Sequence, residues 1–321
     1  MSEEQQFQGD RWTTQTSNIL TELGWIQKGD SNFDIPCSNK ALHKTGENPR
    51  KNPHGIDLLF SYFDPHKKKD LTVVVESKHR KWNGINTSNI QDFVDQLLMT
   101  VDCATTNTQL KTLGCQNVRT GLLMIWCNEP ELFDEQKFRE YLKNLNLHPR
   151  KNPIPIYVAS NTEILRMCSL INKVKEIDQN PDTESFSFFY PSDYFSGGQT
   201  PSLRKEHINL TYMFSKYIFA KSRIANRSRN GTTIDEVNHV FFFATPTLEE
   251  LNFMYSCIKK FQFEDADKLL IHFYDEQTDY RVEIKEFLRA KQEELKRQKS
   301  YLVIETDYMT PLSKVPENYS L

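Results

Sequence analysis

The chain has 321 residues, which is more than one typical core needs and predicts two domains. Its net charge of −3 excludes a globally basic nucleic-acid-binding protein, so any basic surface must be local. No apolar run approaches the roughly 18 residues of a membrane span. The polar start Met-Ser-Glu-Glu-Gln-Gln is unlike a signal peptide, so we expect a cytoplasmic protein with no membrane association.

The first half of the chain alternates helical and strand patterns. Trp12, Ile19 and Leu23 recur at helical spacing and predict a helix over residues 7–25. Strands are predicted within 25–35 and at 55–63, 71–78, 118–127 and 154–159, and helices at 88–102, 134–145 and 161–175. This alternation predicts an α/β fold with a mixed sheet flanked by helices.

The second half repeats this alternation after an acidic, proline-containing stretch at 176–185, which we interpret as a linker. Strands are predicted at 186–190, 237–244, 268–274 and 300–306, helices at 247–261 and 279–298, and a mostly helical segment at 202–224. The sequence therefore predicts a first domain at 1–175 and a second α/β domain at 186–321, whose elements suit binding of a partner, a ligand or DNA.

The cysteines are scattered at positions 37, 103, 115, 127, 168 and 257 and form no Cys-x-x-Cys pair. This pattern is typical of buried thiols in a reducing compartment. A zinc site built from Cys37 with His43 or His54 lacks a second close pair of ligands, so buried thiols are the preferred interpretation.

Three charged residues, Asp57, Glu76 and Lys78, lie in two short apolar segments. Asp57 belongs to Gly-Ile-Asp-Leu-Leu-Phe at 55–60, and the other two belong to Val-Val-Val-Glu-Ser-Lys at 73–78. Side chains alternate along a strand, so Glu76 and Lys78 point the same way, and pairing of the strands would bring Asp57 to Glu76. Two carboxylates form an oxygen site suited to Mg²⁺, and a neighbouring ammonium can orient or deprotonate water, which is the chemistry of phosphodiester hydrolysis.

The alternative interpretation of Glu76 and Lys78 is an exposed ion pair on a surface strand. The run of valines before them argues against it, because the strand then lies in the middle of the sheet. Charges that emerge from a buried strand need a partner or a function. We therefore favour a metal-binding nuclease site.

The order of these segments resembles the restriction-endonuclease-like PD-(D/E)XK nuclease superfamily, and most closely its Mrr-like branch. The resemblance covers roughly the first half: the helix ending in Leu-Gly-Trp at 23–25, the Gly-Ile-Asp strand, the Glu-Ser-Lys strand, a tryptophan-containing loop at 79–86 and a helix carrying Phe93. It implies cleavage of DNA with Mg²⁺, for which Mn²⁺ can substitute, with Asp57 and Glu76 as metal ligands and Lys78 as the catalytic lysine. Glu22 and Gln91 match auxiliary positions. Ile56 stands where other members have proline, as it does in many Mrr-like nucleases.

Local positive charge supplies candidate DNA contacts on both sides of the proposed site. The residues are Lys44, Arg50, Lys51, His54, His79, Arg80 and Lys81. Such groups neutralise phosphates without reading sequence, although polar loops commonly carry them without binding DNA. A second basic cluster of Lys221, Arg223, Arg227 and Arg229 either extends a nucleic-acid groove or keeps a loop soluble.

A nuclease followed by an α/β unit is similar to the nuclease subunit of a two-component bacterial anti-phage defence system. That resemblance implies defence or restriction, with a partner subunit or a homo-oligomer. A repair or junction-resolving nuclease, and a non-catalytic subunit that keeps the fold for DNA or protein binding, stay open as alternatives. The sequence carries no phosphate-binding Gly-x-x-x-x-Gly-Lys loop, no Gly-x-Gly-x-x-Gly and no Gly-x-Ser-x-Gly.

Overall fold

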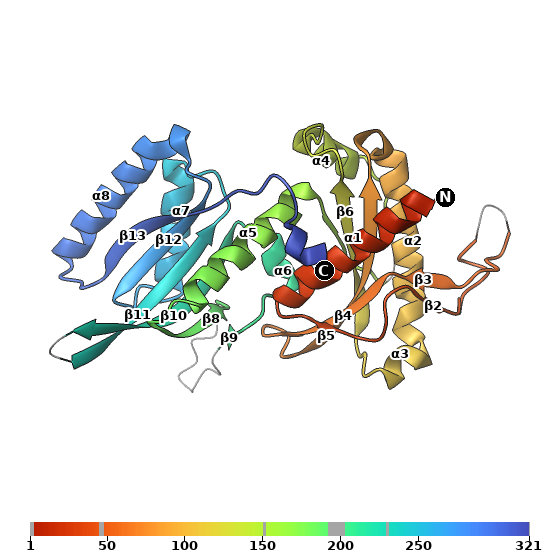
Figure 1. Ribbon diagram of the computed structural model, residues 1–321, viewed down its shortest axis with the longest axis horizontal. Coiled ribbons are helices and arrows are strands. Elements are labelled where there is room, and N and C mark those ends of the chain that lie inside the picture. Colours follow the sequence, from red (N-terminus) through yellow and green to blue (C-terminus); the bar gives the residue numbers. More distant parts are fainter. Residues whose placement is uncertain (1–2, 45–47, 150–151, 192–202, 229–230, 321) are drawn as a thin grey trace. The chain divides into compact units, whose positions relative to one another are not determined.

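The chain folds into two compact units. The computed structural model describes residues 3–44, 48–149, 152–191, 203–228 and 231–320 (Figure 1). Unit 1 comprises residues 1–64, 68–165 and 313–321, and unit 2 comprises residues 65–67 and 166–312. Among the described residues, no helix is long and apolar enough to cross a membrane.

The division differs from the boundaries expected from the sequence. It falls at Leu165 inside α5 (Asn161–Asp178), because the helical pattern continues unbroken through this position. The stretch 176–185, interpreted as a linker, instead holds the end of α5 and the start of β8 (Thr183–Phe189). Residues 313–321 return to unit 1, where the side-chain amide of Asn18 donates to the Tyr319 carbonyl at 2.9 Å.

Unit 1 is built on a five-stranded mixed sheet with the strand order β1-β4-β5-β6-β7. These strands are β1 (Ile26–Gln27), β4 (Leu58–Asp64), β5 (Lys69–Arg80), β6 (Val118–Cys127) and β7 (Ile156–Ala159). β4 is antiparallel to β1 and β5, whereas β5, β6 and β7 run parallel. The apolar runs of β5 and β6 follow from this central position, where helices cover both faces. A separate hairpin pairs β2 (Phe33–Ile35) with β3 (His54–Ile56).

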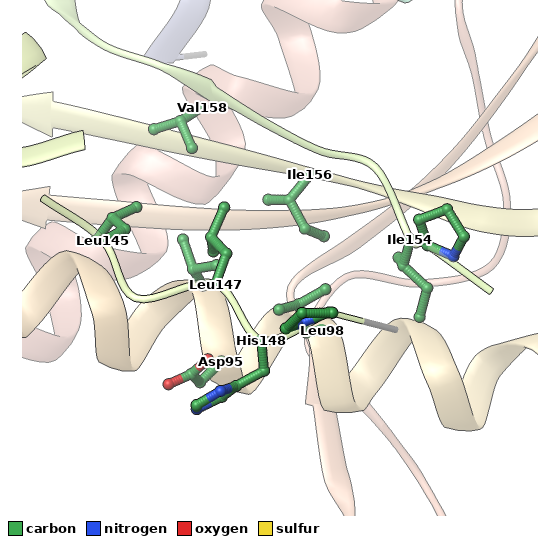
Figure 2. A pocket seen from close by; sticks show the side chains of 11 residues that line it. Asp95, Leu98, Leu145, Leu147, His148, Ile154, Ile156 and Val158 are labelled. Atoms are coloured by element: carbon green, nitrogen blue, oxygen red, sulfur yellow. The ribbon is translucent and has the colours of Figure 1, made fainter. Parts of the chain in front are cut away.

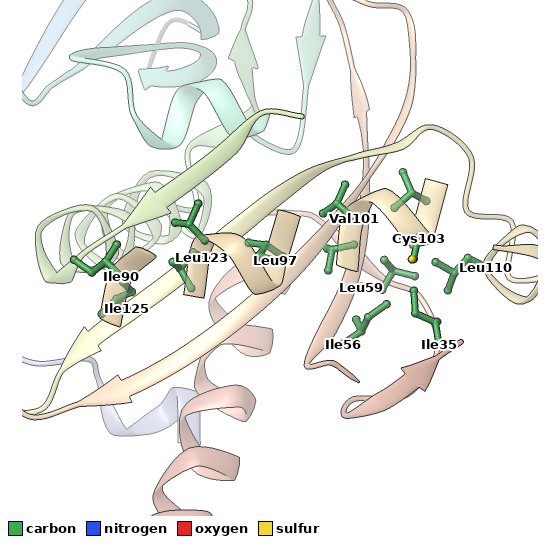
Figure 3. Close-up of a cluster of buried hydrophobic side chains, with 14 of the residues drawn as sticks. Ile35, Ile56, Leu59, Ile90, Leu97, Val101, Cys103, Leu110, Leu123 and Ile125 are labelled. Carbon is green, nitrogen blue, oxygen red and sulfur yellow. The ribbon is translucent and has the colours of Figure 1, made fainter. Parts of the chain in front are cut away.

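Two long helices cover opposite faces of this sheet (Figure 1). On one face α1 (Glu3–Glu22) places Trp12 against Trp126, with ring centroids 5.7 Å apart, and the indole donates to the Met124 carbonyl at 3.2 Å. On the other face α2 (Thr87–Thr106) packs Ile90, Leu97 and Val101 against Leu59, Leu123 and Ile125 (Figure 3). Successive residues of β6 thus belong to different layers, as strand geometry requires. The smaller elements of unit 1 are η1 (Trp82–Gly84), α3 (Thr108–Thr112), α4 (Glu135–Lys143) and η3 (Glu317–Ser320).

Unit 2 is a six-stranded sheet with the order β13-β12-β11-β10-β8-β9. Its further strands are β9 (Arg204–Lys205), β10 (Tyr217–Ser228), β11 (Gly231–Phe242), β12 (Lys268–Tyr274) and β13 (Val303–Met309). Its shorter helices are α6 (Leu210–Met213) and η2 (Thr278–Tyr280). The parallel strands β11, β12 and β13 are connected through α7 (Leu248–Lys260) and α8 (Arg281–Arg297), which share one apolar core with the sheet. This is the second α/β fold that the sequence predicted.

The expectation of a mostly helical segment at 202–224 is wrong. Among the described residues of this segment, 203–224, only Leu210–Met213 is α-helical. β10 pairs antiparallel with β11 from Tyr217, opposite Phe242, to Ser228, opposite Gly231. The consecutive residues Ile218, Phe219 and Ala220 are all buried, as in a strand covered on both faces. The helix-compatible lysine and alanine residues obscured this strand, whereas the Asn230-Gly231 pair is a known hairpin signal in the sequence.

Candidate active site

The three candidate catalytic residues lie where the chain enters β4 and where β5 ends. Asp57 stands between β3 and β4, rather than inside a strand as the sequence predicted, and is half-buried. Leu58 is paired with Val75, so the register brings the next residues, Asp57 and Glu76, beside each other. Asp57 Oδ2 accepts a hydrogen bond of 2.7 Å from the Ser77 backbone amide. This bond holds the carboxylate against β5.

Glu76 and Lys78 lie on the same face of β5, as strand alternation predicts. Glu76 is only 8% exposed, and Lys78 Nζ donates a hydrogen bond to Glu76 Oε1. This is the face that α2 covers, because Val74 packs in the α2 core and Lys78 Nζ lies 5.6 Å from the ring centroid of Phe93 on α2. The ammonium is therefore held between a carboxylate and an aromatic face, with little freedom to move.

The electrostatics of the cluster suit a divalent cation. Burial raises the pKa of Glu76; the Lys78 ammonium opposes this shift and the Asp57 carboxylate adds to it. Two carboxylates, one of them bonded to the Lys78 ammonium, thus lie close together at a largely buried position. Carboxylate oxygens are the ligands that hard cations such as Mg²⁺ prefer. The residues present fit such an ion, which Asp57 and Glu76 would hold.

The sequence family agrees with this geometry. The model of the family described as "GAPS4 protein PD-(D/E)XK nuclease domain" matches residues 1–163. The chain belongs to this family. No curated protein matches the chain. The matched GAPS4 nuclease domain ends close to the division between the units at Leu165 and contains Asp57, Glu76 and Lys78. PD-(D/E)XK nucleases generally use divalent metals, and the Mrr-like branch stays a prediction.

The structure does not bring the auxiliary candidate Glu22 to the carboxylates of the nuclease domain. Glu22 is the last residue of α1 and is exposed. α1 covers the face of the sheet that carries Met124 and Trp126, whereas Glu76 and Lys78 lie on the α2 face. Helical spacing alone could not show which face of a sheet the first helix would cover.

Gln91 lies on the correct side of the sheet but is engaged elsewhere. Its amide oxygen accepts from the Asn146 backbone amide at 2.8 Å, and its amide nitrogen donates to the Asn146 carbonyl at 3.3 Å and to Asp95 at 3.1 Å. Gln91 therefore fastens the segment that follows α4 to α2. It positions a loop of the GAPS4 nuclease domain and does not bond the carboxylate pair.

That loop borders a partly open apolar pocket of about 490 Å³ between α2 and β7 (Figure 2). Asp95 and Leu98 of α2, Leu147 and His148 of the loop, and Ile156 of β7 are among its lining residues. Asp57, Glu76 and Lys78 do not line it. The pocket is thus separate from the candidate catalytic cluster.

Four of the predicted DNA contacts are exposed in the nuclease domain. Lys44, Lys51, Arg80 and Lys81 are exposed, and the Arg80 guanidinium lies 5.2 Å from the same Phe93 ring that Lys78 approaches. Arg50 is half-buried and donates to the carbonyls of Asn52 and Pro53, each at 3.0 Å. Arg80 and Lys81 therefore place positive charge directly beyond the catalytic cluster, and Arg50 mainly braces its own loop.

The two histidines among the predicted contacts are poorly placed for phosphate binding. His54 is fully buried, and burial, followed by Arg50 and His43, lowers its pKa to about 4, so it is neutral at pH 7. His79 faces away from Glu76 and Lys78 and lines a cavity of about 370 Å³ with Arg11 and Trp126. Burial, Arg80 and Arg11 lower the pKa of His79. The sequence could not separate these buried rings from the exposed lysines.

The second basic cluster is largely compensated within unit 2. Lys221 Nζ lies 5.3 Å from the Phe189 ring and 5.1 Å from the Phe263 ring. Arg223 pairs with Glu236 at 3.1 Å, and Arg227 pairs with Asp182 at 3.4 Å. Arg229 lies outside the described residues. The described members thus have intramolecular partners and do not form an open basic groove.

Proposed function

We propose that unit 1 is a metal-dependent endodeoxyribonuclease that hydrolyses phosphodiester bonds with Mg²⁺, or with Mn²⁺ in its place. The observation that carries the proposal is the Asp57 carboxylate, fixed by the Ser77 amide beside the buried Glu76–Lys78 pair. Membership of the PD-(D/E)XK nuclease family supports it. The family description also names GAPS4, which supports a role in bacterial anti-phage defence or restriction.

Each residue of the cluster has a distinct role in this proposal. Asp57 and Glu76 hold the cation, which when bound polarises the phosphate and lowers the pKa of a water. Lys78, held at Glu76, orients the attacking water or stabilises the negative charge that develops on the phosphate. Arg80 and Lys81 lie within a few residues of Lys78 and neutralise phosphates on either side of the cut.

The proposal is tested by cleavage of plasmid and linear DNA by the full chain with Mg²⁺ or Mn²⁺. Asp57→Asn and Lys78→Ala should each lower the cleavage rate by at least about 100-fold, since each removes a group required in the transition state. Asp70→Asn and Lys69→Ala are matched controls, because both residues are exposed at the far end of β5, and they should cut at the wild-type rate.

Two results would contradict the proposal. One is a wild-type chain that never cuts DNA with either metal, alone or with its natural partner, which would favour a non-catalytic subunit. The other is wild-type cleavage by both site variants, which would show that the site is elsewhere. A strong preference for branched over linear DNA would instead favour a repair or junction-resolving nuclease.

We further propose that the chain works with a partner subunit or as a homo-oligomer, with unit 2 as the accessory domain. Unit 2 has its own α/β core and supplies no part of the candidate catalytic cluster, which supports a separate role in binding a partner, a ligand or DNA. Co-purification with the product of a neighbouring gene tests the complex with a partner subunit. The molecular mass in solution tests the homo-oligomer. A monomer without any co-purifying protein would contradict both.

A further inference from the structure

Unit 1 contains a second cluster of metal-ligating side chains, outside the candidate catalytic site. Cys37, His43, His54 and Cys103 are all buried, and one ligand atom from each lies within 4.8 Å of the others. Cys37 follows β2, His43 lies in the loop between β2 and β3, His54 begins β3, and Cys103 comes from α2. In Figure 3 Cys103 lies near the end of α2, in the core that also holds Ile35 of β2.

Four of the six distances among these atoms match a tetrahedral zinc site, and the other two, from His54 to the sulfurs, are within 4.8 Å. Zinc binds sulfur at about 2.3 Å and imidazole nitrogen at about 2.0–2.1 Å, so tetrahedral ligands stand about 3.8 Å apart for two sulfurs, about 3.6 Å for sulfur and nitrogen and about 3.3 Å for two nitrogens. The Sγ atoms of Cys37 and Cys103 are 3.9 Å apart, and the two sulfurs lie 3.5 and 3.4 Å from His43 Nδ1. His43 Nδ1 lies 3.3 Å from His54 Nε2.

We propose that Cys37, His43, His54 and Cys103 bind one Zn²⁺ ion as a structural Cys₂His₂ site. An acidic side chain outside the cluster supports this assignment: His43 Nε2 lies 3.1 Å from Asp102 Oδ2. A proton on Nε2 donates to this carboxylate and leaves the Nδ1 lone pair facing the cluster. Histidines that bind metals commonly have such a carboxylate on the second ring nitrogen, which fixes the tautomer.

Other chemistries of these residues agree less well with the geometry. A disulfide between Cys37 and Cys103 needs a sulfur–sulfur distance of about 2.05 Å, and both thiols are free. A catalytic zinc keeps one position open for water, whereas here four buried side chains fill the tetrahedron. Without a metal, His54 Nε2 and the two thiols would all compete for the single lone pair of His43 Nδ1, from which they lie 3.3, 3.5 and 3.4 Å away. One cation satisfies all four groups at once.

The ion would join parts of unit 1 that are far apart in the sequence. It links the loop between β2 and β3, which carries Lys44, Arg50 and Lys51, to α2. His54 and Asp57 are separated only by Gly55 and Ile56, so the ion also anchors the strand that leads into the candidate catalytic cluster. Metal binding of this kind contributes directly to folding.

The first test is the zinc content of the full chain, purified without a histidine tag and dialysed against metal-free buffer. Elemental analysis should give about one zinc per chain, and Cys37→Ser and Cys103→Ser should lose it. Cys115→Ser is the matched control, because Cys115 is a buried thiol of the same core outside the cluster, and it should keep the zinc. A wild-type chain that contains no zinc as purified and takes none up after addition of Zn²⁺ would overturn the proposal.

Further measurements separate this ion from one at the candidate catalytic site. Asp57→Asn and Glu76→Gln should keep the zinc, and Co²⁺ in its place should give the visible absorption of tetrahedral thiolate coordination. Zinc that is lost in these two variants but kept in Cys37→Ser and Cys103→Ser would assign the ion to the nuclease site and overturn the proposal. Asp102→Asn should weaken zinc binding by about 10–100-fold, measured against a chromophoric chelator, without change in circular dichroism. Unchanged affinity in both Asp102→Asn and Cys103→Ser would equally overturn it.

Discussion

The Phe93 ring gathers two cations at the edge of the candidate catalytic cluster. Lys78 Nζ and Arg80 Cζ lie 5.6 and 5.2 Å from its centroid, but only Lys78 bonds Glu76. In the proposed function, Lys78 therefore takes part in the chemistry, whereas Arg80 and the exposed Lys81 contact the DNA backbone. These two roles differ in their dependence on salt, which affects phosphate contacts far more than the chemical step.

Arg80→Ala and Lys81→Ala should each weaken DNA binding without abolishing cleavage. Each removes about one phosphate contact, so the negative slope of log affinity against log salt should become shallower by about 0.9. The change should be the same for DNA of any sequence. Fluorescence anisotropy with a short duplex and Ca²⁺ measures this slope. Lys69→Ala, at the far end of β5, should leave it unchanged. A wild-type slope in both variants would place the DNA elsewhere on the domain.

For single residues, the sequence predicted correctly which side chains lie together where strand pairing decides their neighbours. The two-residue period of β5 put Glu76 and Lys78 on one face, and the β4–β5 register brought Asp57 to them. Glu22 and Cys103 could not be judged in this way. The role of Glu22 depends on which face of the sheet α1 covers. The role of Cys103 depends on contacts between residues more than sixty positions apart in the sequence, such as its contact with Cys37.

At Gly121, β6 lies close to Leu97 of α2 and to Ile156 of β7. A Cβ atom there would lie 2.8 Å from Leu97 Cγ and 2.6 Å from Ile156 Cδ1. Both distances are below normal contact, and Leu97 is fully buried in the core. The absence of a side chain at this position therefore sets the distance between the sheet and the helix that carries Phe93.

Gly121→Ala should destabilise unit 1 by about 1–3 kcal/mol, because the added methyl group overlaps the fully buried Leu97 side chain and forces it to move. The midpoint and slope of urea unfolding, followed by tryptophan fluorescence, measure the change. Gly9→Ala is the matched control. Gly9 lies inside α1 with nothing within 4 Å of the added Cβ, so alanine there should leave stability unchanged or raise it by up to about 1 kcal/mol. Equal effects of the two substitutions would disprove the tight approach.

The elements themselves were predictable where a local period was clear. The predicted strand at 118–127 coincides with β6, and that at 268–274 coincides with β12. β10 was missed because its outward residues are basic and suit a helix, and only pairing with β11 decides its conformation. The end of the first domain was missed for a related reason: α5 has one continuous amphipathic pattern on both sides of Leu165.

In the whole molecule, a buried chain of polar groups links the stability of unit 2 to pH. Unit 2 contains a buried polar chain in which Ser222 Oγ lies 2.8 Å from His239 Nε2, His239 Nδ1 lies 2.9 Å from His272 Nε2, and His272 Nδ1 lies 3.1 Å from Asp307 Oδ2. Burial lowers the pKa of His239. Burial also lowers the pKa of His272, because its effect exceeds the opposing effect of Asp307. The hydrogen bond from His272 holds the pKa of Asp307 well below its usual range.

These shifts predict that acid destabilises unit 2 first through its histidines. Below about pH 6.5 the unfolded chain protonates both rings while the folded unit does not, so stability falls by up to about 1.4 kcal/mol per pH unit for each ring. Asp307 acts in a lower window. Its contribution is complete above about pH 3.9 and is lost as the pH falls towards its depressed folded value.

Hydrogen exchange of the β11 and β12 amides between pH 7.5 and 5, corrected for intrinsic rates, isolates this effect. All tryptophans, at positions 12, 25, 82 and 126, lie in unit 1, so fluorescence would report that unit and its candidate zinc site instead. His239→Gln should remove one titrating ring. The dependence of the unfolding free energy on pH should then decrease by the contribution of one histidine, whatever the stability of the variant at pH 7.5. His148→Gln, an exposed histidine of unit 1, should keep the wild-type slope. If protection of β11 and β12 does not change with pH in the wild type, or if both variants show the same slope, the buried histidines are not what couples this fold to acid.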